Sequence, residues 1–467
     1  MTNIKTDDQL VTNFLDRAVE NVYPSKEAFG TAMKSGKQLT AYLGIDPTGP
    51  SLHLGHAIAM KKLRQLQELG HKVILLIGDF TAMIGDPTDK ATARKKLTRE
   101  QVLENCKNYR EQAAKILDMD GSQTGNPVDM KYNSEWLGKM SFADVVELAS
   151  HFTVQQMLER DMFRRRMSWR SVCPRCKKEN LLSAEVQQTV TDEHGNKVVL
   201  SSIDDLTWQC KECGNKYTTE TANEIHSPRP VFVHEFLYPL MQGYDSVAMD
   251  VDVEVGGNDQ TFNMLAGREL MKDLKQKEKF VLTAKLLADP DGKKMGKSEG
   301  NMITLDDAPD QMFGKVMSWT DGMIADGFEL CTDVPGEEID AMVEKMEEGE
   351  NPVAFKRLLA KEIVAAWHSA EAAERAEQDF DRLFKKHEAP DEMPEFTVDL
   401  KRHKLIDLLV LSGLAPSKSD ARRQIEQGAV KVDGQSVDDP EAETEMVNAY
   451  LILQKGKRYF AKIILKS

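Results

Sequence analysis

One stretch near the N-terminus constrains the fold most, because it joins a strand to a helix through a short loop. Residues 39–45 form an apolar run of strand length, and residues 57–69 repeat apolar side chains at helical spacing before a closing glycine. Asp-Pro-Thr-Gly-Pro at 46–50 is typical of the loop between them. A strand, a loop and a helix in this order predict one unit of a parallel α/β sheet.

The alternation continues along the first two thirds of the chain. Residues 73–77 predict a second strand, and residues 99–117 predict further helix. We therefore expect a Rossmann-like parallel-sheet catalytic domain over residues 1–306. Ligands of such sheets bind at the carboxyl ends of the strands, so the loop at 46–50 is the first place to search for a site.

The sequence HLGH at 53–56 opens the first predicted helix. His53 and His56 then lie one turn apart at a helix N-terminus, where free N–H groups and the helix dipole favour phosphate. Gly55 between them has no side chain, so a nucleotide can approach closely. The alternatives are an ordinary turn and a zinc site, although no carboxylate lies at metal-ligand spacing.

A second motif, KMGKS at 294–298, follows the turn sequence Asp-Pro-Asp-Gly at 289–292. Lys294 and Lys297 bring two ammonium groups to one loop, and positive charge of this kind stabilises a leaving pyrophosphate. The plain alternative is a solvated basic loop. HLGH and KMGKS in this order together predict an enzyme that activates a carboxylate with ATP.

Three further segments follow or interrupt the catalytic domain. Residues 170–225 predict a zinc-ribbon-like insertion, and residues 307–388, rich in Ala, Glu, Met and Lys, predict a helical domain. Residues 389–397 are a Pro- and acid-rich linker. Residues 398–467 predict a C-terminal α+β module with two helices and a hairpin.

Four of the six cysteines form two C-x-x-C pairs, 33 residues apart: Cys173, Cys176, Cys210 and Cys213. Two thiolates from each tight turn fill the corners of a tetrahedron, so the pairs predict a structural Zn²⁺. Reduced, unliganded thiols are the alternative, and disulfides are disfavoured in a reducing compartment. Between the pairs, residues 189–193 and 197–201 flank His-Gly-Asn and predict a hairpin. Cys106 and Cys331 are expected to be packing residues.

The chain carries a net charge of −15, which on its own argues against a nucleic-acid partner. The C-terminal module differs, because its 12 basic and 10 acidic residues give it a net charge of +2. Its basic residues gather on one predicted helix and one hairpin, and we expect them to bind RNA phosphates. A solvated helix face is the alternative. The candidate RNA-binding residues are Lys418, Arg422, Arg423, Lys455, Lys457 and Arg458.

The order of motifs resembles the bacterial-type tyrosyl-tRNA synthetases, a family of class I aminoacyl-tRNA synthetases. Apart from residues 173–225, the resemblance covers most of the chain. The C-terminal module is similar to an RNA-binding module named after a small-subunit ribosomal protein. The matching stretches are YLGIDPTGPSLHLGH (42–56), GDFTAMIGDPTDK (78–90), HEFLYPLMQGYD (234–245), VGGNDQ (255–260) and KKMGKSEGN (293–301).

The resemblance implies a tyrosine pocket in this chain. Tyr42 and Asp245 would bind the phenolic hydroxyl, Asp86, Tyr238 and Gln242 the α-ammonium, and Gln260 would lie near the carboxylate. Carboxylates suit a cation and an O–H donor. The residues implied for ATP are Asp46, Gly55, Gly257, Asp259, Lys297 and Ser298.

The same resemblance implies a two-step reaction. Tyrosine would attack the α-phosphate of Mg²⁺-bound ATP, and the adenylate would then pass to the 3′ end of tRNA(Tyr). His53, His56 and Thr48 would stabilise the developing charge, Lys294 and Lys297 the pyrophosphate, with help from Lys90 and Arg94. Two positions depart from the family: Glu254 stands where relatives usually carry Gln, and Gly296 replaces the middle serine of the lysine motif.

Three alternative functions fit parts of the same sequence. They are an H-x-G-H nucleotidyltransferase acting on a metabolite, a non-catalytic RNA-binding paralogue, and the sibling tryptophanyl-tRNA synthetases. The basic tail, the intact motifs, and Gln242 with Asp245 argue against them in turn. The resemblance also implies a homodimer. The polar start and the lack of an apolar run of about 18 residues predict a cytoplasmic protein without a membrane span.

Overall fold

A computed structural model gives the chain as two compact units. One comprises Met1–Asp306 with Glu329–Cys331, and the other comprises Asp307–Phe328 with Thr332–Ser467. In the part of the chain that the structure describes, no helix is long and apolar enough to cross a membrane. The described residues are 4–87, 97–182, 189–191, 197–199, 207–218, 220–289, 302–382, 393–399, 402–445, 450–456 and 459–466.

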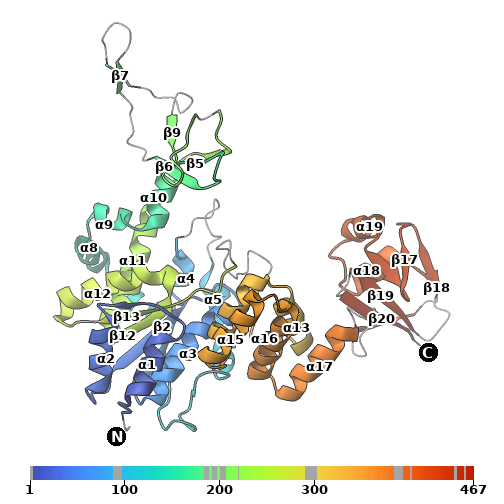
Figure 1. Ribbon diagram of the computed structural model, residues 1–467, viewed down its shortest axis with the longest axis horizontal. Coiled ribbons are helices and arrows are strands. Elements are labelled where there is room, and N and C mark those ends of the chain that lie inside the picture. The colour runs from blue at the N-terminus through green and yellow to red at the C-terminus, as the bar shows by residue number, and fades with distance from the viewer. Residues whose placement is uncertain are drawn as a thin grey trace. The chain divides into compact units, whose positions relative to one another are not determined.

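A six-stranded sheet with the order β1-β13-β12-β2-β3-β4 forms the centre of the first unit (Figure 1). Every neighbouring pair is parallel except β1 with β13. Strands β2 and β3 are buried along almost their whole length, as expected for a sheet covered on both faces. The strands are β1 (Val19–Tyr23), β2 (Thr40–Ile45), β3 (Lys72–Ile77), β4 (Asp129–Tyr132), β12 (Val253–Gly257) and β13 (Phe280–Ala284).

The strand order fixes the position of the site. From β2 the chain moves outward to β3 and β4, and it then returns to the other side of β2 with β12 and β13. The order therefore reverses between β2 and β12, and ligands bind at the carboxyl ends of strands at such a reversal. The expected parallel α/β class is confirmed.

Helices α3 (Leu54–Glu68), α11 (Val233–Met249) and α12 (Thr261–Lys275) carry most of the site. Helices α11 and α12 approach closely because two glycines face each other: a Cβ on Gly267 would lie 3.2 Å from the Cα of Gly243. The other helices of this unit are α1 (Asp8–Asp16), α2 (Lys26–Lys34), α4 (Thr81–Ile84), α5 (Arg99–Cys106), α6 (Tyr109–Ala113), α7 (Ser134–Leu137), α8 (Phe142–Ser150), α9 (Val154–Leu158) and α10 (Asp161–Met167).

The insertion follows α10 and projects as a small β structure (Figure 1). Strands β5 (Trp169–Val172), β6 (Glu179–Leu182) and β11 (Glu224–His226) form an antiparallel sheet, and β9 (Thr207–Gln209) pairs with β10 (Lys216–Thr218). Strands β7 (Thr189–Thr191) and β8 (Lys197–Val199) form the predicted hairpin, whose turn lies outside the described residues. Buried Trp208 and Tyr217 pack beside the four cysteines as a separate small core.

The second unit begins with helices, as the sequence predicts, and ends in an α+β module. The helices are α13 (Pro309–Met317), α14 (Ile324–Cys331), α15 (Gly336–Glu347), α16 (Pro352–Trp367) and α17 (Ala370–Asp381). The module contains α18 (Leu405–Leu411), α19 (Lys418–Glu426) and a sheet of order β14-β20-β19-β16-β17. Its strands are β14 (Glu395–Val398), β15 (Arg402–Lys404), β16 (Val430–Val432), β17 (Gln435–Val437), β18 (Glu443–Glu445), β19 (Tyr450–Lys455) and β20 (Tyr459–Leu465).

One boundary of this module differs from the sequence expectation. Strand β14 includes Glu395–Thr397, which the composition assigned to the linker. It pairs in parallel with β20, from Glu395 opposite Lys462 to Val398 opposite Leu465. The strand therefore belongs to the C-terminal module.

Candidate active site

The two histidines of HLGH form the N-terminus of α3. His53 is the N-cap, and its Nδ1 accepts a hydrogen bond from the backbone N–H of Gly55 at 3.1 Å. His56 Nδ1 accepts from the backbone N–H of His53 at 3.2 Å. A neutral ring whose Nδ1 accepts must carry its proton on Nε2. Both rings therefore present an Nε2–H donor, and neither Nδ1 is available to a metal.

Both imidazoles are neutral near pH 7. Burial lowers the pKa of His53 to about 4. Burial, and then the neighbouring His53, lower the pKa of His56 well below its ordinary value. The ring centroids lie 3.9 Å apart. Two adjacent N–H donors at a helix N-terminus suit a phosphate oxygen.

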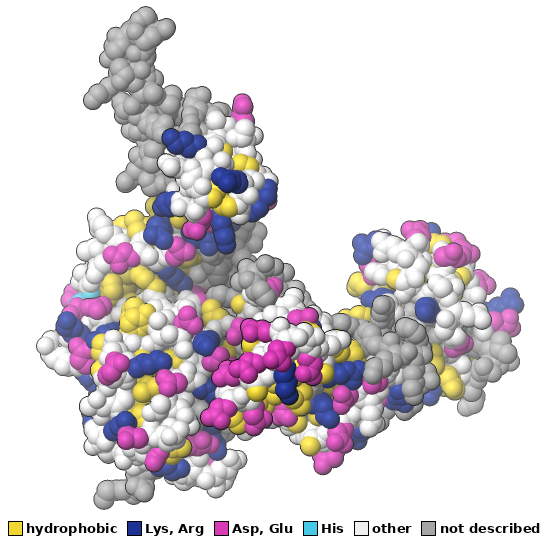
Figure 2. Space-filling view, in the orientation of Figure 1, with side chains coloured by type: hydrophobic (Ala, Val, Ile, Leu, Met, Phe, Trp, Pro, Cys, Tyr) yellow, Lys and Arg dark blue, Asp and Glu magenta, His cyan; other side chains and the backbone are white. Residues whose placement is uncertain are grey.

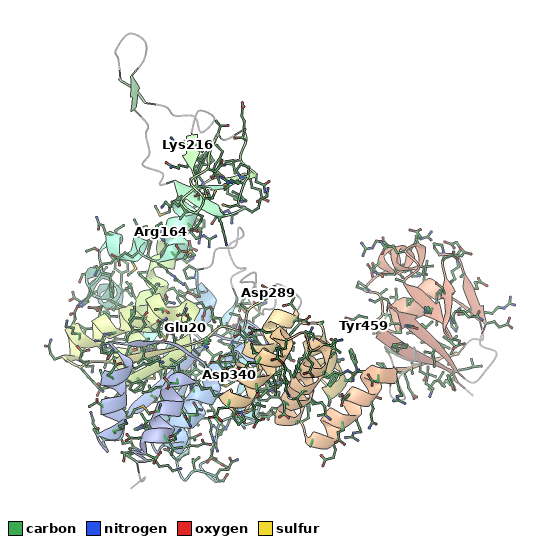
Figure 3. All side chains as sticks on the ribbon, in the orientation of Figure 1. Glu20, Arg164, Lys216, Asp289, Asp340 and Tyr459 are labelled. Carbon is green, nitrogen blue, oxygen red and sulfur yellow. The ribbon has the colours of Figure 1, made fainter. Side chains whose placement is uncertain are left out.

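The chain that follows the lysine motif returns to this helix. Leu54 N–H donates to Ile303 O at 3.1 Å, and Leu305 N–H donates to Leu52 O at 2.9 Å. On the other side of the motif, the described chain ends at Asp289, which Figure 3 labels, soon after β13. Lys294, Lys297 and Ser298 lie outside the described residues, as do Lys90 and Arg94. The motif is thus bounded by β13 and by a segment paired with HLGH.

The two residues that the resemblance places at the phenolic hydroxyl, Tyr42 and Asp245, are both buried. Tyr42 is fully buried, and its hydroxyl lies 3.0 Å from Ser246 Oγ. Asp245 accepts from Trp136 Nε1 at 2.7 Å and from Asn133 Nδ2 at 3.3 Å. Burial raises the pKa of Asp245 well above its ordinary value, and these two donors oppose the rise. Because both contacts are donors, the carboxyl oxygens act as acceptors.

The candidate ammonium end contains Asp86 among amide groups. Asp86 accepts from Gln260 Nε2 at 3.2 Å and from Asn263 Nδ2 at 3.3 Å. It also accepts from Arg160 Nη2 at 2.9 Å. Asn263 Nδ2 donates in addition to Gln242 Oε1 at 3.0 Å. Asp86, Gln242 and Gln260, which are expected around the amino-acid backbone, therefore all accept from the side-chain amide of Asn263.

Asp46, which is expected at ATP, contacts a residue that is expected at the ammonium group of tyrosine. Its carboxylate accepts from Thr81 Oγ1 at 2.7 Å and from Tyr238 OH at 2.6 Å. Gly78 makes room for it, because a Cβ there would collide with the Asp46 carboxylate. The sequence expectation put Tyr238 at the ammonium and Asp46 at ATP, and the structure brings the two into direct contact. Thr48 is exposed on the loop after β2.

The remaining nucleotide candidates lie at the end of β12. Gly257 is the last residue of the strand, and a Cβ there would lie 2.7 Å from Asp259 Oδ1. Gly55 is exposed beside the His53 ring. These glycines open the carboxyl ends of β2 and β12, where the strand order reverses.

Several residues of this network escaped the sequence analysis. Asn133 directly follows β4, so a polar residue at the end of a strand was a usable signal. Arg160 stands before a run of three arginines and resembles a solvated helix face. Trp136, Ser246 and Asn263 follow no pattern that separates them from ordinary packing residues.

The four knuckle cysteines lie together, with all four sulfurs within 4.8 Å of one another. Cys173 Sγ lies 3.8 Å from Cys213 Sγ, and Cys176 Sγ lies 3.4 Å from Cys210 Sγ. A tetrahedral site with Zn–S bonds of about 2.3 Å requires sulfur separations of about 3.8 Å. The group is therefore able to hold a metal ion.

The two knuckles repeat one backbone design. Cys173 N–H donates to Lys178 O, and Cys210 N–H donates to Asn215 O, each at 2.9 Å. The residue after each second cysteine is left-handed, Lys177 with φ 61° and Gly214 with φ 67°. Only the second knuckle has a glycine at this left-handed position.

The candidate RNA-binding residues lie on the C-terminal module. Lys418, Arg422 and Arg423 are exposed on α19 or at its start and pair with Asp407, Glu441 and Asp420. Lys455 instead donates to Leu414 O and lies 5.2 Å from the centre of the Tyr459 ring. Exposed ion pairs contribute little stability, so phosphates can displace the acids. Lys457 and Arg458 lie outside the described residues.

Comparison with known proteins agrees with this geometry. Residues 33–173 and 200–385 match the class I tRNA synthetases (W and Y), and residues 386–463 match the tyrosine–tRNA ligase SYY-like C-terminal domain. Among curated relatives, a tyrosine–tRNA ligase of Moorella thermoacetica is 42% identical over 454 residues, which cover 96% of this chain and 94% of the relative. One of Haemophilus ducreyi is 41% identical over 97% of both chains.

Solved structures agree on the fold. A C-terminally truncated mitochondrial tyrosyl-tRNA synthetase of Aspergillus nidulans has a TM-score of 0.56 and 20% identity over 80% of this chain and 94% of its own. The tyrosyl-tRNA synthetase of Archaeoglobus fulgidus, solved with L-tyrosine, has a TM-score of 0.52 and 19% identity over 79% of this chain and 99% of its own. The chain belongs to the class I tRNA synthetases (W and Y), as a tyrosine–tRNA ligase.

Proposed function

We propose a role for each side chain in the two steps of this reaction. A carboxylate oxygen of tyrosine forms a bond to the α-phosphorus of ATP, and the bond to the β-phosphate oxygen breaks, which releases pyrophosphate. The terminal ribose hydroxyl of tRNA then attacks the carbonyl carbon, and AMP leaves. Class I synthetases use ATP, commonly with Mg²⁺, and the ion travels with the phosphates as part of the substrate.

The observation that carries the proposal is the pair of Nε2–H donors on His53 and His56. They lie at the N-terminus of α3, which follows β2 at the reversal point of the sheet. We assign them, with Thr48, to the charge that develops on the α-phosphate. Positioning and electrostatics then provide most of the rate, because phosphoryl chemistry of this kind needs little covalent help.

The tyrosine slot completes this assignment. Tyr42 and Asp245 would hold the phenolic hydroxyl, and Asp86, Tyr238 and Gln242 the ammonium group. Gln260 would lie near the carboxylate, where its contact with Asp86 supports it. Asp46, Gly55, Gly257 and Asp259 would line the nucleotide, Lys297 and Ser298 would join them, and Lys294, Lys297, Lys90 and Arg94 would take the pyrophosphate.

ATP–pyrophosphate exchange, measured with each natural amino acid in turn, tests the slot. Tyrosine should be the only amino acid that supports substantial exchange, because phenylalanine leaves the buried groups of Tyr42 and Asp245 unpaired. Discrimination of about 10⁴–10⁵-fold against phenylalanine is an established property of tyrosyl-tRNA synthetases. Strong exchange with tryptophan or phenylalanine would contradict the proposed slot.

We infer that the cysteine cluster holds one structural Zn²⁺. The sulfur separations, the paired knuckles and the all-thiolate ligand set support zinc, and four protein ligands leave no open position for catalysis. The metal would therefore stabilise the insertion, whose own apolar core is small.

We also propose that the chain works as a homodimer in the cytoplasm. Large apolar side chains are exposed on α8, α9 and the start of α11: Phe142 at 84%, Val154 at 67% and Val233 at 79%. Figure 2 shows hydrophobic side chains on this side of the first unit. A second copy of the chain is the proposed occupant. Light scattering should give twice the chain mass, and Phe142→Asp should shift it toward the monomer.

For the C-terminal module, we propose that Lys418, Arg422, Arg423, Lys455, Lys457 and Arg458 bind phosphates of tRNA(Tyr). The exposure of the first three supports this assignment, as does the weakness of their ion pairs.

A further inference from the structure

A buried ion pair lies beneath the tyrosine slot. Lys279 is 0% exposed and Glu254 is 2% exposed, and the Lys279 ammonium contacts Glu254 Oε2. Glu254 is the second residue of β12, and Lys279 directly precedes β13, the neighbouring parallel strand.

A glycine between two closely packed helices leaves space for this ammonium group. A Cβ on Gly267 of α12 would lie 2.5 Å from Lys279 Nζ and 3.0 Å from Ser246 Oγ. Lys279 therefore reaches between α11 and α12 to a serine that adjoins two residues of the slot, Tyr42 and Asp245. Burial lowers the pKa of Lys279, and Glu254 opposes this effect.

The directions of the hydrogen bonds follow from the lysine. An ammonium group only donates, so Ser246 Oγ must accept from Lys279 Nζ at 2.9 Å. Ser246 has one hydrogen to give, and its acceptors are Tyr42 OH at 3.0 Å and Glu254 Oε2 at 3.5 Å. Hydroxyl hydrogen bonds are strong at about 2.5–3.0 Å, which favours Tyr42.

The hydrogen of Tyr42 then has to point elsewhere. Burial, and then the charges of Glu254 and Asp245, raise the pKa of Tyr42 well above its ordinary value, so the hydroxyl keeps its proton. Its oxygen accepts from Ser246, and Glu254 is the second hydrogen-bond partner of Tyr42, so a phenolic oxygen in the slot would compete with this carboxylate for the O–H hydrogen. Asp245, whose charge acts on Tyr42, accepts from Trp136 and Asn133.

We propose that Lys279 and Glu254 are positioning residues that set the direction of a hydrogen-bond relay, from Lys279 to Ser246 to Tyr42 to the phenolic oxygen of tyrosine. The phenolic hydroxyl donates in turn to Asp245. Through this relay, the slot recognises the phenolic hydroxyl of tyrosine both as an acceptor, through a lone pair on its oxygen, and as a donor, through its hydrogen. This inference rests on the proposed roles of Tyr42 and Asp245.

The same carboxylate fixes the other end of the slot. Glu254 Oε1 accepts from Gln242 Nε2 at 3.1 Å. This contact turns Gln242 Oε1 toward Asn263 and the ammonium end, where an acceptor is needed. Glu254 therefore connects the two ends of the slot through two oxygens.

The test uses the double variant Glu254→Gln/Lys279→Met, which removes both charges and keeps an acceptor for Gln242. Replacing a buried ion pair by neutral groups is often tolerated, whereas removing one partner leaves a buried charge. The matched control is Lys277→Met, two residues away, where the ammonium pairs with Asp250 at 3.3 Å and Asp252 at 3.1 Å.

We expect the double variant to fold, with a melting temperature near that of the parent. In ATP–pyrophosphate exchange, its kcat/KM for tyrosine should fall about 10- to 100-fold while that for phenylalanine stays nearly constant. The analogue 4-aminophenylalanine should lose less than tyrosine, because its nitrogen is a weak acceptor and gains little from the Tyr42 O–H. Lys277→Met should change none of these ratios.

The outcomes separate the relay from the slot. A folded double variant with the parent's tyrosine-to-phenylalanine ratio, or with equal losses for all three amino acids, would overturn the relay. Tyr42→Phe is measured beside it. If Tyr42→Phe also leaves the ratio unchanged, the proposed role of Tyr42 fails; if only Tyr42→Phe lowers the ratio, the relay alone fails.

Discussion

At the scale of single residues, the site is defined by which atom of each side chain carries a hydrogen. His53 and His56 accept through Nδ1 from backbone N–H groups, so each ring carries its hydrogen on Nε2. An imidazole in an unfolded chain titrates near pH 6.5. Because the folded pKa of His53 is about 4, the stability that this ring contributes is fully present above about pH 6.5 and is lost as pH falls toward 4.

This ring chemistry gives a prediction for the rate of adenylate formation. In pre-steady-state assays between pH 6.5 and 8.5, the parent should show no inflection from an imidazole, because both rings stay neutral. His56→Ala removes one N–H donor and should slow the step about 10²–10³-fold at every pH in this range. His56→Asn, which keeps an N–H donor and an acceptor, is the control and should recover part of the rate. An unchanged rate for His56→Ala would contradict its assignment.

The residues found from sequence and those missed differ in a physical way. His53 stands in a motif at the start of α3, whereas Tyr42, inside β2, and Asp245, inside α11, were implied by the family resemblance. Lys279 stands in a segment with alternating lysines at 275, 277 and 279, which is typical of a solvated face. Only packing shows that Lys277 stays at the surface while Lys279 is fully buried.

At the scale of elements, the sequence pattern predicted those elements whose hydrogen bonds close between residues near one another in the chain. The C-x-x-C pairs and the hairpin between them form as expected, because each closes within a few residues. Strand β14 was assigned to the linker, because its short sequence EFTV follows prolines and acids. Its strand character comes from pairing with β20, more than 60 residues later in the chain, and no local signal carries this information.

The insertion should contain one zinc per chain. Elemental analysis of reduced, purified protein is expected to give this ratio, and Cys176→Ser or Cys210→Ser should abolish it, since a half-ligated pair of knuckles cannot retain the metal. Cys106→Ser is the matched control, because Cys106 is also buried but lies outside the cluster. Chelation should lower the melting temperature of the insertion. A metal content near zero with an unchanged melting curve would contradict the zinc assignment.

At the scale of the whole molecule, charge and function are distributed unevenly. The motifs for activation lie in the first unit, whereas the net positive charge of residues 398–467 lies in the second. The alternation of strands and helices predicted the parallel sheet. It did not give the position of β12 between β2 and β13, which depends on pairing across some 200 residues.

Removing the C-terminal module should separate the two steps of the reaction. Because β14 belongs to the module, the cut is best placed after Pro394, so that no strand is left without its partner. The truncated chain should keep tyrosine-dependent ATP–pyrophosphate exchange within about threefold, since tyrosine and ATP bind elsewhere. Aminoacylation should be crippled through a raised KM for tRNA, because the phosphate contacts supply much of the affinity.

Charge variants of the full chain provide the control for this truncation. Arg422→Ala and Arg423→Ala change exposed side chains whose ion pairs contribute little to stability, so folding should be unaffected. If each arginine contacts one phosphate, each variant should weaken tRNA binding and lower the slope of log Kd against log salt by about 1. Lys361→Ala, on helix α16, removes a basic side chain outside the module and should leave the slope unchanged. A truncated enzyme that charges tRNA as well as the parent would show that the anchor for tRNA lies elsewhere.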